Sequence, residues 1–116
     1  MADRYIECRS ALPRSYVDFI ESHDGWEGDL GAELGYVVIW NRETIQERWD
    51  AYKMAECMNE HWFPFGSDGG DEMLCFDLSL GQDRVFMLPY IGMSNEAPLP
   101  RFHSFANVAA AILKTA

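Results

Sequence analysis

The chain has 116 residues, the length of one domain with its own hydrophobic core. Apolar residues make up 48% of it, which excludes an intrinsically disordered chain because their burial offsets the entropy lost on folding. No apolar run is long enough to span a membrane, and the first residues lack the pattern of a signal peptide. We therefore expect a single cytoplasmic domain over residues 1–116.

Acidic residues outnumber basic ones, with 19 Asp and Glu against 9 Lys and Arg and a formal net charge of −10. This charge disfavours nucleic acids and anionic membranes as direct partners, because both are bound mainly through cations. A basic protein partner fits the sign of the charge, although an acidic surface can also serve solubility alone.

The cysteines Cys8, Cys57 and Cys75 are odd in number and include no Cys-x-x-Cys pair. This spacing fits neither a disulfide framework nor a zinc site. We expect reduced thiols in mostly apolar surroundings, which agrees with a reducing compartment.

The N-terminal part predicts one amphipathic helix. It begins near Pro13, whose fixed φ suits a first helical turn, and ends at Asp24-Gly25, where glycine can adopt the left-handed conformation that closes a helix. An apolar stripe at helical spacing runs along it, formed by Leu12, Tyr16, Phe19 and Ile20. A connection rich in glycine and acidic residues is expected over 25–35.

The middle of the chain predicts a strand followed by a helix. Residues 36–40 are β-branched or aromatic throughout, which is typical of a strand buried on both faces or nearly so. The helix is predicted over about residues 42–58, with Asn41 as its N-cap. Its apolar positions, including Ile45, Trp49 and Tyr52, recur at helical spacing.

The second half of the chain predicts mostly strands. They are expected over residues 62–65, 73–78 and 85–88, with turns at 67–70 and 81–83. The segment 89–100 contains three prolines and cannot form a central strand, and a last helix is expected from Ser104. The chain therefore predicts an α+β fold, with a mainly antiparallel sheet flanked by N-terminal, middle and C-terminal helices.

Catalytic, metal and phosphate sites all find little support. The histidines lie far apart, at positions 23, 61 and 103, and belong to no catalytic motif. Asp68, Asp71 and Glu72 share a short loop but lack the alternating ligands of a calcium loop. The Gly69-Gly70 pair lies between two strands rather than before a helix, which disfavours phosphate binding. We expect no catalytic residues, no cofactor and no metal; an enzyme or a small-molecule site would require a deep apolar pocket with perturbed titrating groups.

Among the aromatic residues, Trp40, Trp49 and Phe105 fall on the apolar side of their elements and are expected in the core. Trp62 differs, because it begins a strand directly after Glu60-His61. It is either a core residue or an anchor for a partner.

The distribution of acidic residues is the most informative pattern. Residues 18–33 hold six acids without Lys or Arg, and residues 68–83 hold five more, again without a base. Both windows are centred on predicted loops, whereas the helix at 42–58 mixes acids with bases as an ordinary solvated face does. If the two windows meet in space, they form a negative surface that attracts a basic partner.

Several motifs follow one another along nearly the whole chain. They are Leu12-Pro13 with a helix ending at His23-Asp24-Gly25, the strand Val38–Trp40, the hairpin Phe65–Glu72, and Ser104-Phe105 at the last helix. In this order they resemble the SUKH superfamily, specifically its Smi/Knr-like branch, named after yeast cell-wall synthesis regulators. Many members have a third glycine where this chain has Asp71, which makes its turn more polar than usual.

The resemblance implies an α+β fold without established catalytic residues. Bacterial members are often immunity proteins that bind and neutralise polymorphic or contact-dependent toxins, many of them nucleases, whereas fungal members are regulatory interaction modules. We expect an immunity protein that occludes a basic toxin domain; the alternative is a regulatory or scaffolding module that binds a host protein. The expected partner-binding residues are Asp24, Glu27, Asp29, Trp62, Asp68, Asp71, Glu72 and Tyr90.

Overall fold

The computed structural model describes residues 3–90 and 98–115, which form helices and one antiparallel sheet. The helices are α1 (Arg4–Cys8), a 3-10 turn η1 (Arg9–Ala11), α2 (Arg14–His23), α3 (Arg42–Ala51), α4 (Met54–Cys57) and α5 (Phe105–Thr115). The strands are β1 (Trp26–Asp29), β2 (Tyr36–Ile39), β3 (Trp62–Ser67), β4 (Glu72–Asp77), β5 (Val85–Pro89) and β6 (Leu99–Phe102). The α+β class expected from the sequence is confirmed.

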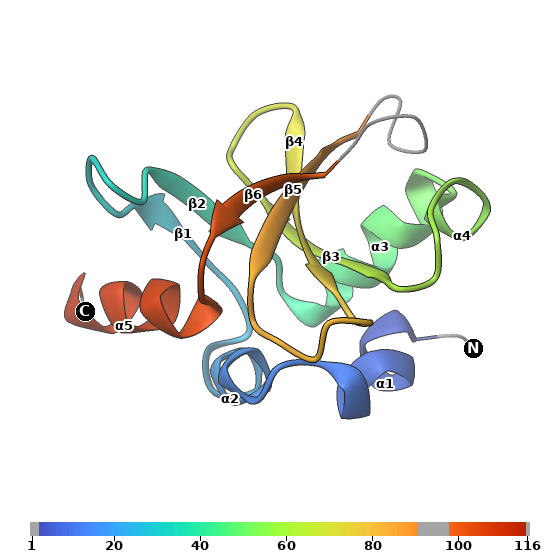
Figure 1. The fold of residues 1–116 in the computed structure, drawn as a ribbon, viewed down its shortest axis with the longest axis horizontal. Helices are drawn as coiled ribbons and strands as arrows, with labels where there is room; N and C mark the ends of the chain where they lie inside the picture. The colour runs from blue at the N-terminus through green and yellow to red at the C-terminus, as the bar shows by residue number, and fades with distance from the viewer. Residues whose placement is uncertain (1–2, 91–97, 116) are drawn as a thin grey trace.

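The six strands lie in the sheet in the order in which they follow in the chain, and each is antiparallel to the next. Between β2 and β3 the chain forms two helices, α3 and α4 (Figure 1). The sheet curls far enough for Arg101 of β6 to donate a 2.6 Å hydrogen bond to the Leu34 carbonyl, in the turn between β1 and β2. The two edges of the sheet are thus tied together.

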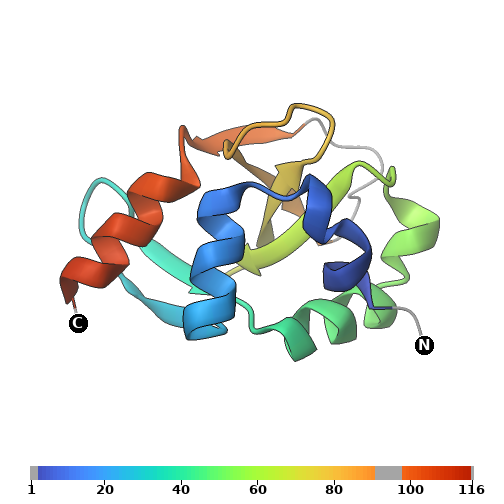
Figure 2. The ribbon, with the colours of Figure 1, turned by 90° about the horizontal axis from the view of Figure 1, so that it is seen from below.

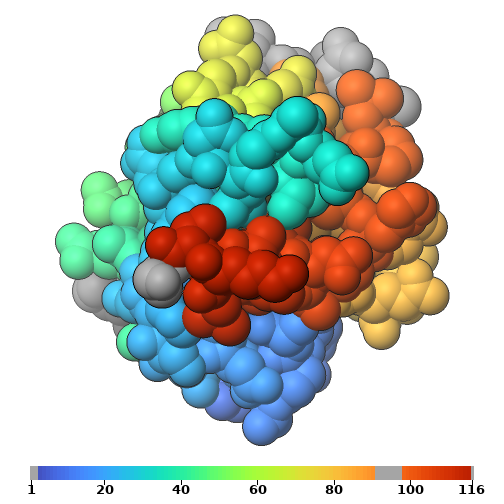
Figure 3. Space-filling view, turned by 90° about the vertical axis from the view of Figure 1, so that its left-hand side faces the viewer, coloured from blue at the N-terminus to red at the C-terminus, as the bar shows by residue number. Residues whose placement is uncertain are grey.

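Helices α5, α2 and α1 lie side by side across one side of the sheet (Figure 2). Tyr16 of α2 is the centre of the core there, with ring centroids of Phe65, Phe76 and Phe105 between 5.1 and 5.4 Å away. On the outer surface, α5 lies between α2 and the β1–β2 hairpin (Figure 3). Phe105 is completely buried, as expected.

The first predicted helix is present as α2, but its end differs from the expectation. Asp24 itself takes the left-handed conformation, with φ of 48°, and its amide donates to the Ile20 carbonyl. Gly25 also has a positive φ, and a side chain there would meet the Ile39 carbonyl at 3.0 Å. Both residues therefore turn the chain from α2 into β1. The short helix α1 was not expected.

Two expectations about the following segment were wrong. The connection expected over 25–35 contains β1, because pairing with β2 makes a strand of a segment with poor strand propensity. The strand expected to be buried on both faces, or nearly so, is buried on one face, since Val37 and Ile39 are buried while Tyr36 is 42% exposed and Val38 is half-buried. Trp40, just after it, is buried as expected.

The helix expected over 42–58 is broken into α3 and α4. The break lies at Lys53, which has a left-handed φ of 50°. Asn41 caps α3 as expected, accepting a 2.8 Å hydrogen bond from the Thr44 amide. Trp49 is only partly buried and lies under the Arg4 guanidinium, 4.1 Å from it, so it borders the core instead of filling it.

The predicted strands of the second half are all present, each slightly longer or shifted by a residue. Pro100 lies in β6 at the edge of the sheet, where a missing backbone donor is tolerated. The rest of the proline-containing segment, residues 91–97, lies outside the described part of the chain. Among the described residues, no helix is long and apolar enough to cross a membrane.

Candidate functional site: an acidic pocket with aromatic walls

A pocket of about 1310 Å³ opens between the β1–β2 pair, helix α3 and the hairpin that joins β3 to β4. Its described lining includes four carboxylates (Asp24, Glu27, Asp68 and Asp71) and five aromatic side chains (Trp26, Tyr36, Trp40, Tyr52 and Tyr90). We call it the acidic pocket. It combines residues from both acidic windows of the sequence.

The sheet register explains why the two windows meet. Glu27 lies opposite Val38, and Val38 lies opposite Ser67, so all three side chains share one face of the sheet. This arrangement requires β3 to approach β2 closely at Gly66, where an added Cβ atom would lie 2.1 Å from the Val38 carbonyl oxygen. The hairpin that follows Ser67 then brings Asp68 into the same pocket lining as Glu27.

Tyr36 connects the two windows directly. Its hydroxyl donates a hydrogen bond to the Glu27 carboxylate, which raises the pKa of Tyr36. Its ring lies against Gly69, where a Cβ atom would come within 2.7 Å of the ring. Gly69 also has a φ of +88°, so both its conformation and its lack of a side chain suit this contact.

Hydrogen bonds within the hairpin between β3 and β4 hold its turn, which the Gly69-Gly70 pair predicts. Asp68 accepts a 2.8 Å hydrogen bond from the Gly70 amide, and the buried Ser67 hydroxyl accepts one from Gly69. Asp71 is exposed. Within the described part of the chain, neither Asp68 nor Asp71 forms an ion pair. Both carboxylates therefore present uncompensated charge.

Asp24 differs from the other carboxylates of the pocket. It forms an ion pair with Arg42 at 3.3 Å and accepts a second bond, of 3.0 Å, from the Arg42 amide. Its charge is thus largely compensated within the protein. The uncompensated carboxylates of the lining are Glu27, Asp68 and Asp71.

Three aromatic rings line the other wall. Tyr90 lies 6.4 Å from Trp40 and 5.0 Å from Tyr52, measured between ring centroids. Burial raises the pKa of Tyr90, which is only partly exposed. The guanidinium of Arg48 lies over the Trp40 ring at 5.6 Å and is the one cation in the described lining. The aromatic wall already holds a cation over a ring.

The structure places five of the eight expected partner-binding residues in this pocket: Asp24, Glu27, Asp68, Asp71 and Tyr90. The other three, Asp29, Glu72 and Trp62, do not line it. Asp29 is exposed at the end of β1 and accepts a bond from the Gly31 amide. Glu72 lies in β4 opposite Pro89.

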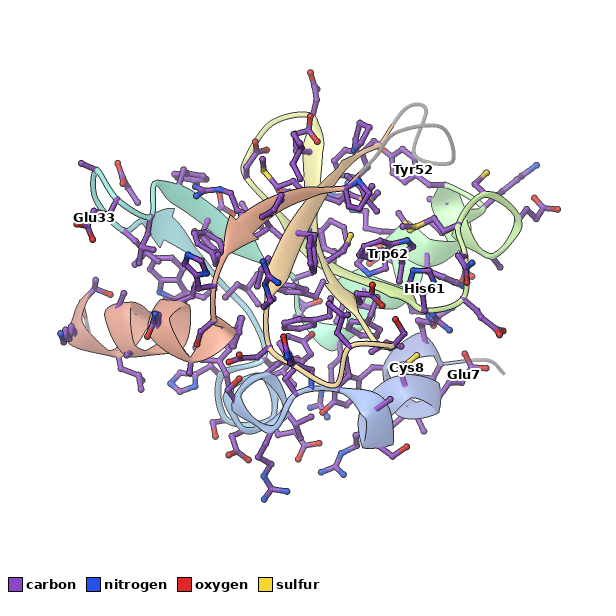
Figure 4. The ribbon with its side chains drawn as sticks, in the orientation of Figure 1. Glu7, Cys8, Glu33, Tyr52, His61 and Trp62 are labelled. Carbon is purple, nitrogen blue, oxygen red and sulfur yellow. The ribbon has the colours of Figure 1, made fainter. Side chains whose placement is uncertain are left out.

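Trp62 lies at the end of β3 remote from the hairpin (Figure 4). It is partly buried, with its ring 5.7 Å from Phe86 and 4.9 Å from His61. Arg4 donates to its carbonyl oxygen at 2.9 Å. Both of its expected roles, core and anchor, stay open, but its side chain does not line the acidic pocket.

More of the negative charge in the first acidic window, residues 18–33, is neutralised than its sequence indicates. Arginines from outside it neutralise three of its acids, through the pairs Arg14–Asp18, Arg9–Glu21 and Arg42–Asp24. The sequence also did not single out Tyr36, Tyr52 or Arg48 as pocket residues. No local pattern indicates Tyr36, because residues 36–40 are apolar throughout, and the placement of Arg48 depends on how α3 packs.

The described residues contain no group of three or more His, Cys, Asp or Glu side chains placed to hold a metal ion. Two of the histidines make local contacts: His23 stacks on Phe19, and His61 lies 3.9 Å from Asp77. Cys8 and Cys75 are buried and Cys57 is exposed, all as free thiols. The distinctive surface feature is thus the acidic pocket.

The match with a known protein family covers most of the chain. No curated protein matches it significantly. The model of the SMI1/KNR4 family (SUKH-1) matches residues 8–108, which include the acidic pocket and the sheet. The chain belongs to the SMI1/KNR4 family (SUKH-1).

Proposed function

We propose that this protein is a cytoplasmic immunity protein that neutralises a toxin by binding it through the acidic pocket. SUKH proteins are often immunity proteins or regulators, and the family is generally not enzymatic. The observation that carries the proposal is the convergence of Glu27, Asp68 and Asp71, none of them in an ion pair with a described residue, on one pocket. In this proposal residues 1–116 act as one binding domain and transform no substrate.

The mechanism is occlusion combined with electrostatic mimicry. A nuclease toxin must hold Lys and Arg side chains where the phosphates of its substrate bind. The carboxylates of the acidic pocket would occupy those positions and block the substrate. Close charge pairs at such interfaces contribute about 1.5–7 kcal/mol each, whereas pairs at the rim contribute far less.

Apolar contacts would supply the remaining affinity. Tyr36 and Tyr52 are 42% and 39% exposed and border the pocket, where a partner can cover them. Aromatic side chains are enriched among the residues that dominate binding energy at interfaces. These two tyrosines therefore replace Trp62 as the anchors that we propose beside Tyr90.

The test uses the product of a toxin gene encoded beside this one. We expect the two proteins to co-purify, and expression of this chain to restore growth of cells that produce the toxin. Asp68→Asn/Asp71→Asn should weaken binding about tenfold or more. Glu7→Gln/Glu33→Gln, which changes the net charge equally at positions outside the pocket (Figure 4), should stay within about twofold of the wild type.

Two results would contradict the proposal. Equal binding by the pocket variant and the control variant would remove the acidic pocket from the interface. Recovery of a host protein in place of a toxin, without protection of growth, would favour the regulatory or scaffolding alternative.

A further inference from the structure

We infer that the acidic pocket accepts an arginine side chain, presented by an extended basic segment of the partner. This inference rests on the proposed function and specifies what the partner inserts. It follows from the charge, the aromatic wall and the size of the pocket taken together.

The charge of the described lining favours a cation. Glu27, Asp68 and Asp71 face the pocket without a cation of their own, while Arg48 contributes one positive charge. The lining is therefore negative even after Asp24 is counted as neutralised by Arg42. An anionic ligand would be repelled, and a neutral one would leave the carboxylates unpaired.

The aromatic wall favours a guanidinium over an ammonium. A guanidinium is planar, stacks on aromatic faces, and forms two parallel hydrogen bonds with one carboxylate. Tyr90 and Tyr52 lie 5.0 Å apart with an angle of 37° between their rings. The Tyr90 amide donates a 3.1 Å hydrogen bond to the Asp71 carbonyl oxygen, so this aromatic wall adjoins the hairpin that carries the Asp68 and Asp71 carboxylates.

Arg48 shows that this wall tolerates a guanidinium. It lies 5.6 Å from the centroid of the Trp40 ring, within the range of a cation–π contact. The positive charge of Arg48 is the main electrostatic obstacle to the binding of a second cation in the pocket. The uncompensated carboxylates outnumber it three to one in the described lining.

The size of the pocket points to a segment instead of a free small molecule. Its volume of about 1310 Å³ exceeds the ~300–1,000 Å³ typical of small-molecule sites. Carboxylates stand on two separate elements, with Glu27 on β1 and Asp68 after β3. A basic side chain with its flanking residues fills such a site better than a single metabolite does.

The test is an NMR titration of the ¹⁵N-labelled full chain with three capped tripeptides. They are acetyl-Gly-Arg-Gly-amide, the same peptide with citrulline, which has the shape of arginine but no charge, and the same peptide with lysine. We expect the arginine peptide to shift amides of the pocket, including Gly69, Gly70 and Glu27. The citrulline peptide should bind about tenfold more weakly, and the lysine peptide several-fold more weakly.

The same titration on Asp68→Asn/Asp71→Asn should lose most of the arginine-induced shifts, while Glu7→Gln/Glu33→Gln should keep them. Equal shifts with citrulline, shifts spread over the surface, or shifts that survive in the pocket variant would each overturn the inference. Equal affinity for lysine would overturn the preference for a guanidinium. If the peptide fails but the toxin still loses affinity for the pocket variant, the proposed function stands and only the arginine insertion is refuted.

Discussion

Two groups of carboxylates in this protein share the same acidic sequence windows but differ in how the folded protein binds them. Glu21 and Asp83 are bound by groups of the protein, whereas Asp68 and Asp71 project from a hairpin without a counter-charge among the described residues. All four belong to the acidic windows. Their partners in the fold, and not their neighbours in the chain, separate a structural acid from one that is free to meet another protein.

Glu21 and Asp83 each join elements that are distant in sequence. Glu21 accepts bonds from the Tyr5 hydroxyl at 2.7 Å and from Arg9 at 2.6 Å, which link α2 to the N-terminal segment. Asp83 accepts bonds from the hydroxyls of Ser15 and Ser104 and from the Ala106 amide, and so caps α5. Neither carboxylate is available to a partner without a cost in stability.

The largest expected effect comes from the strand contact that brings the two windows together. Gly66→Ala should lower the free energy of unfolding by more than about 3 kcal/mol, because the new methyl group would collide with the Val38 carbonyl. Gly70→Ala is the matched control, since the nearest atom to its Cβ is 3.4 Å away. Urea denaturation of both variants compares them directly. A Gly66→Ala protein as stable as the control would contradict the packing described here.

Asp83→Ala should cost about 2 kcal/mol of stability, because three donors around the start of α5 lose their acceptor. Asp71→Ala should change stability by no more than about 0.5 kcal/mol, since Asp71 is exposed and in no ion pair with a described residue. Thermal and urea unfolding measure both. Equal losses in the two variants would erase the distinction between structural and free carboxylates.

A pair of tyrosines extends the same distinction to the core. The Tyr16 hydroxyl is buried without a hydrogen-bond partner among the described residues, so Tyr16→Phe should stabilise the protein by about 1 kcal/mol. Tyr5→Phe removes a bond to Glu21 and should destabilise it by about 1 kcal/mol. Opposite signs in urea denaturation are the expected result. A loss of stability in both variants would show that Tyr16 has a partner.

The smallest effect concerns pH. The hydrogen bonds from Arg9 and Tyr5 lower the pKa of Glu21 from 4.5 to about 2, and burial with the Glu21 bond raises the pKa of Tyr5 to about 12. Because the folded state lowers the pKa of Glu21, its contribution is complete above about pH 4.5 and is lost as the pH falls towards 2. Glu21→Gln should therefore reduce the fall in melting temperature over this range. An unchanged pH profile would contradict the pairing.

Sequence periodicity predicted the elements whose own residues favour them. Helix α2 has its apolar stripe, β3 and β4 have short runs of aromatic and other apolar residues, and the hairpin between them has its two glycines. It missed β1, where glutamate, glycine and aspartate form a strand only because β2 pairs with them. It also missed the break at Lys53, a left-handed residue that is neither glycine nor asparagine.

The acidic windows located much of the candidate site for a physical reason. Charge of one sign on adjacent loops is visible without knowledge of the fold, and the antiparallel register then brings the loops together. The arginine partners of Glu21 and Asp24 come from other segments and depend on tertiary packing. So do Tyr36 and Arg48, whose places in the pocket no local pattern indicates.

The most direct test of the central claim is the salt dependence of toxin binding. Affinity of the wild-type chain for the toxin should fall steeply as the salt concentration rises from 50 to about 500 mM, because exposed charges are screened. Asp68→Asn/Asp71→Asn should start weaker and show a markedly shallower slope, while Glu7→Gln/Glu33→Gln keeps the wild-type slope. An affinity that ignores both the salt and the pocket substitutions would contradict the account.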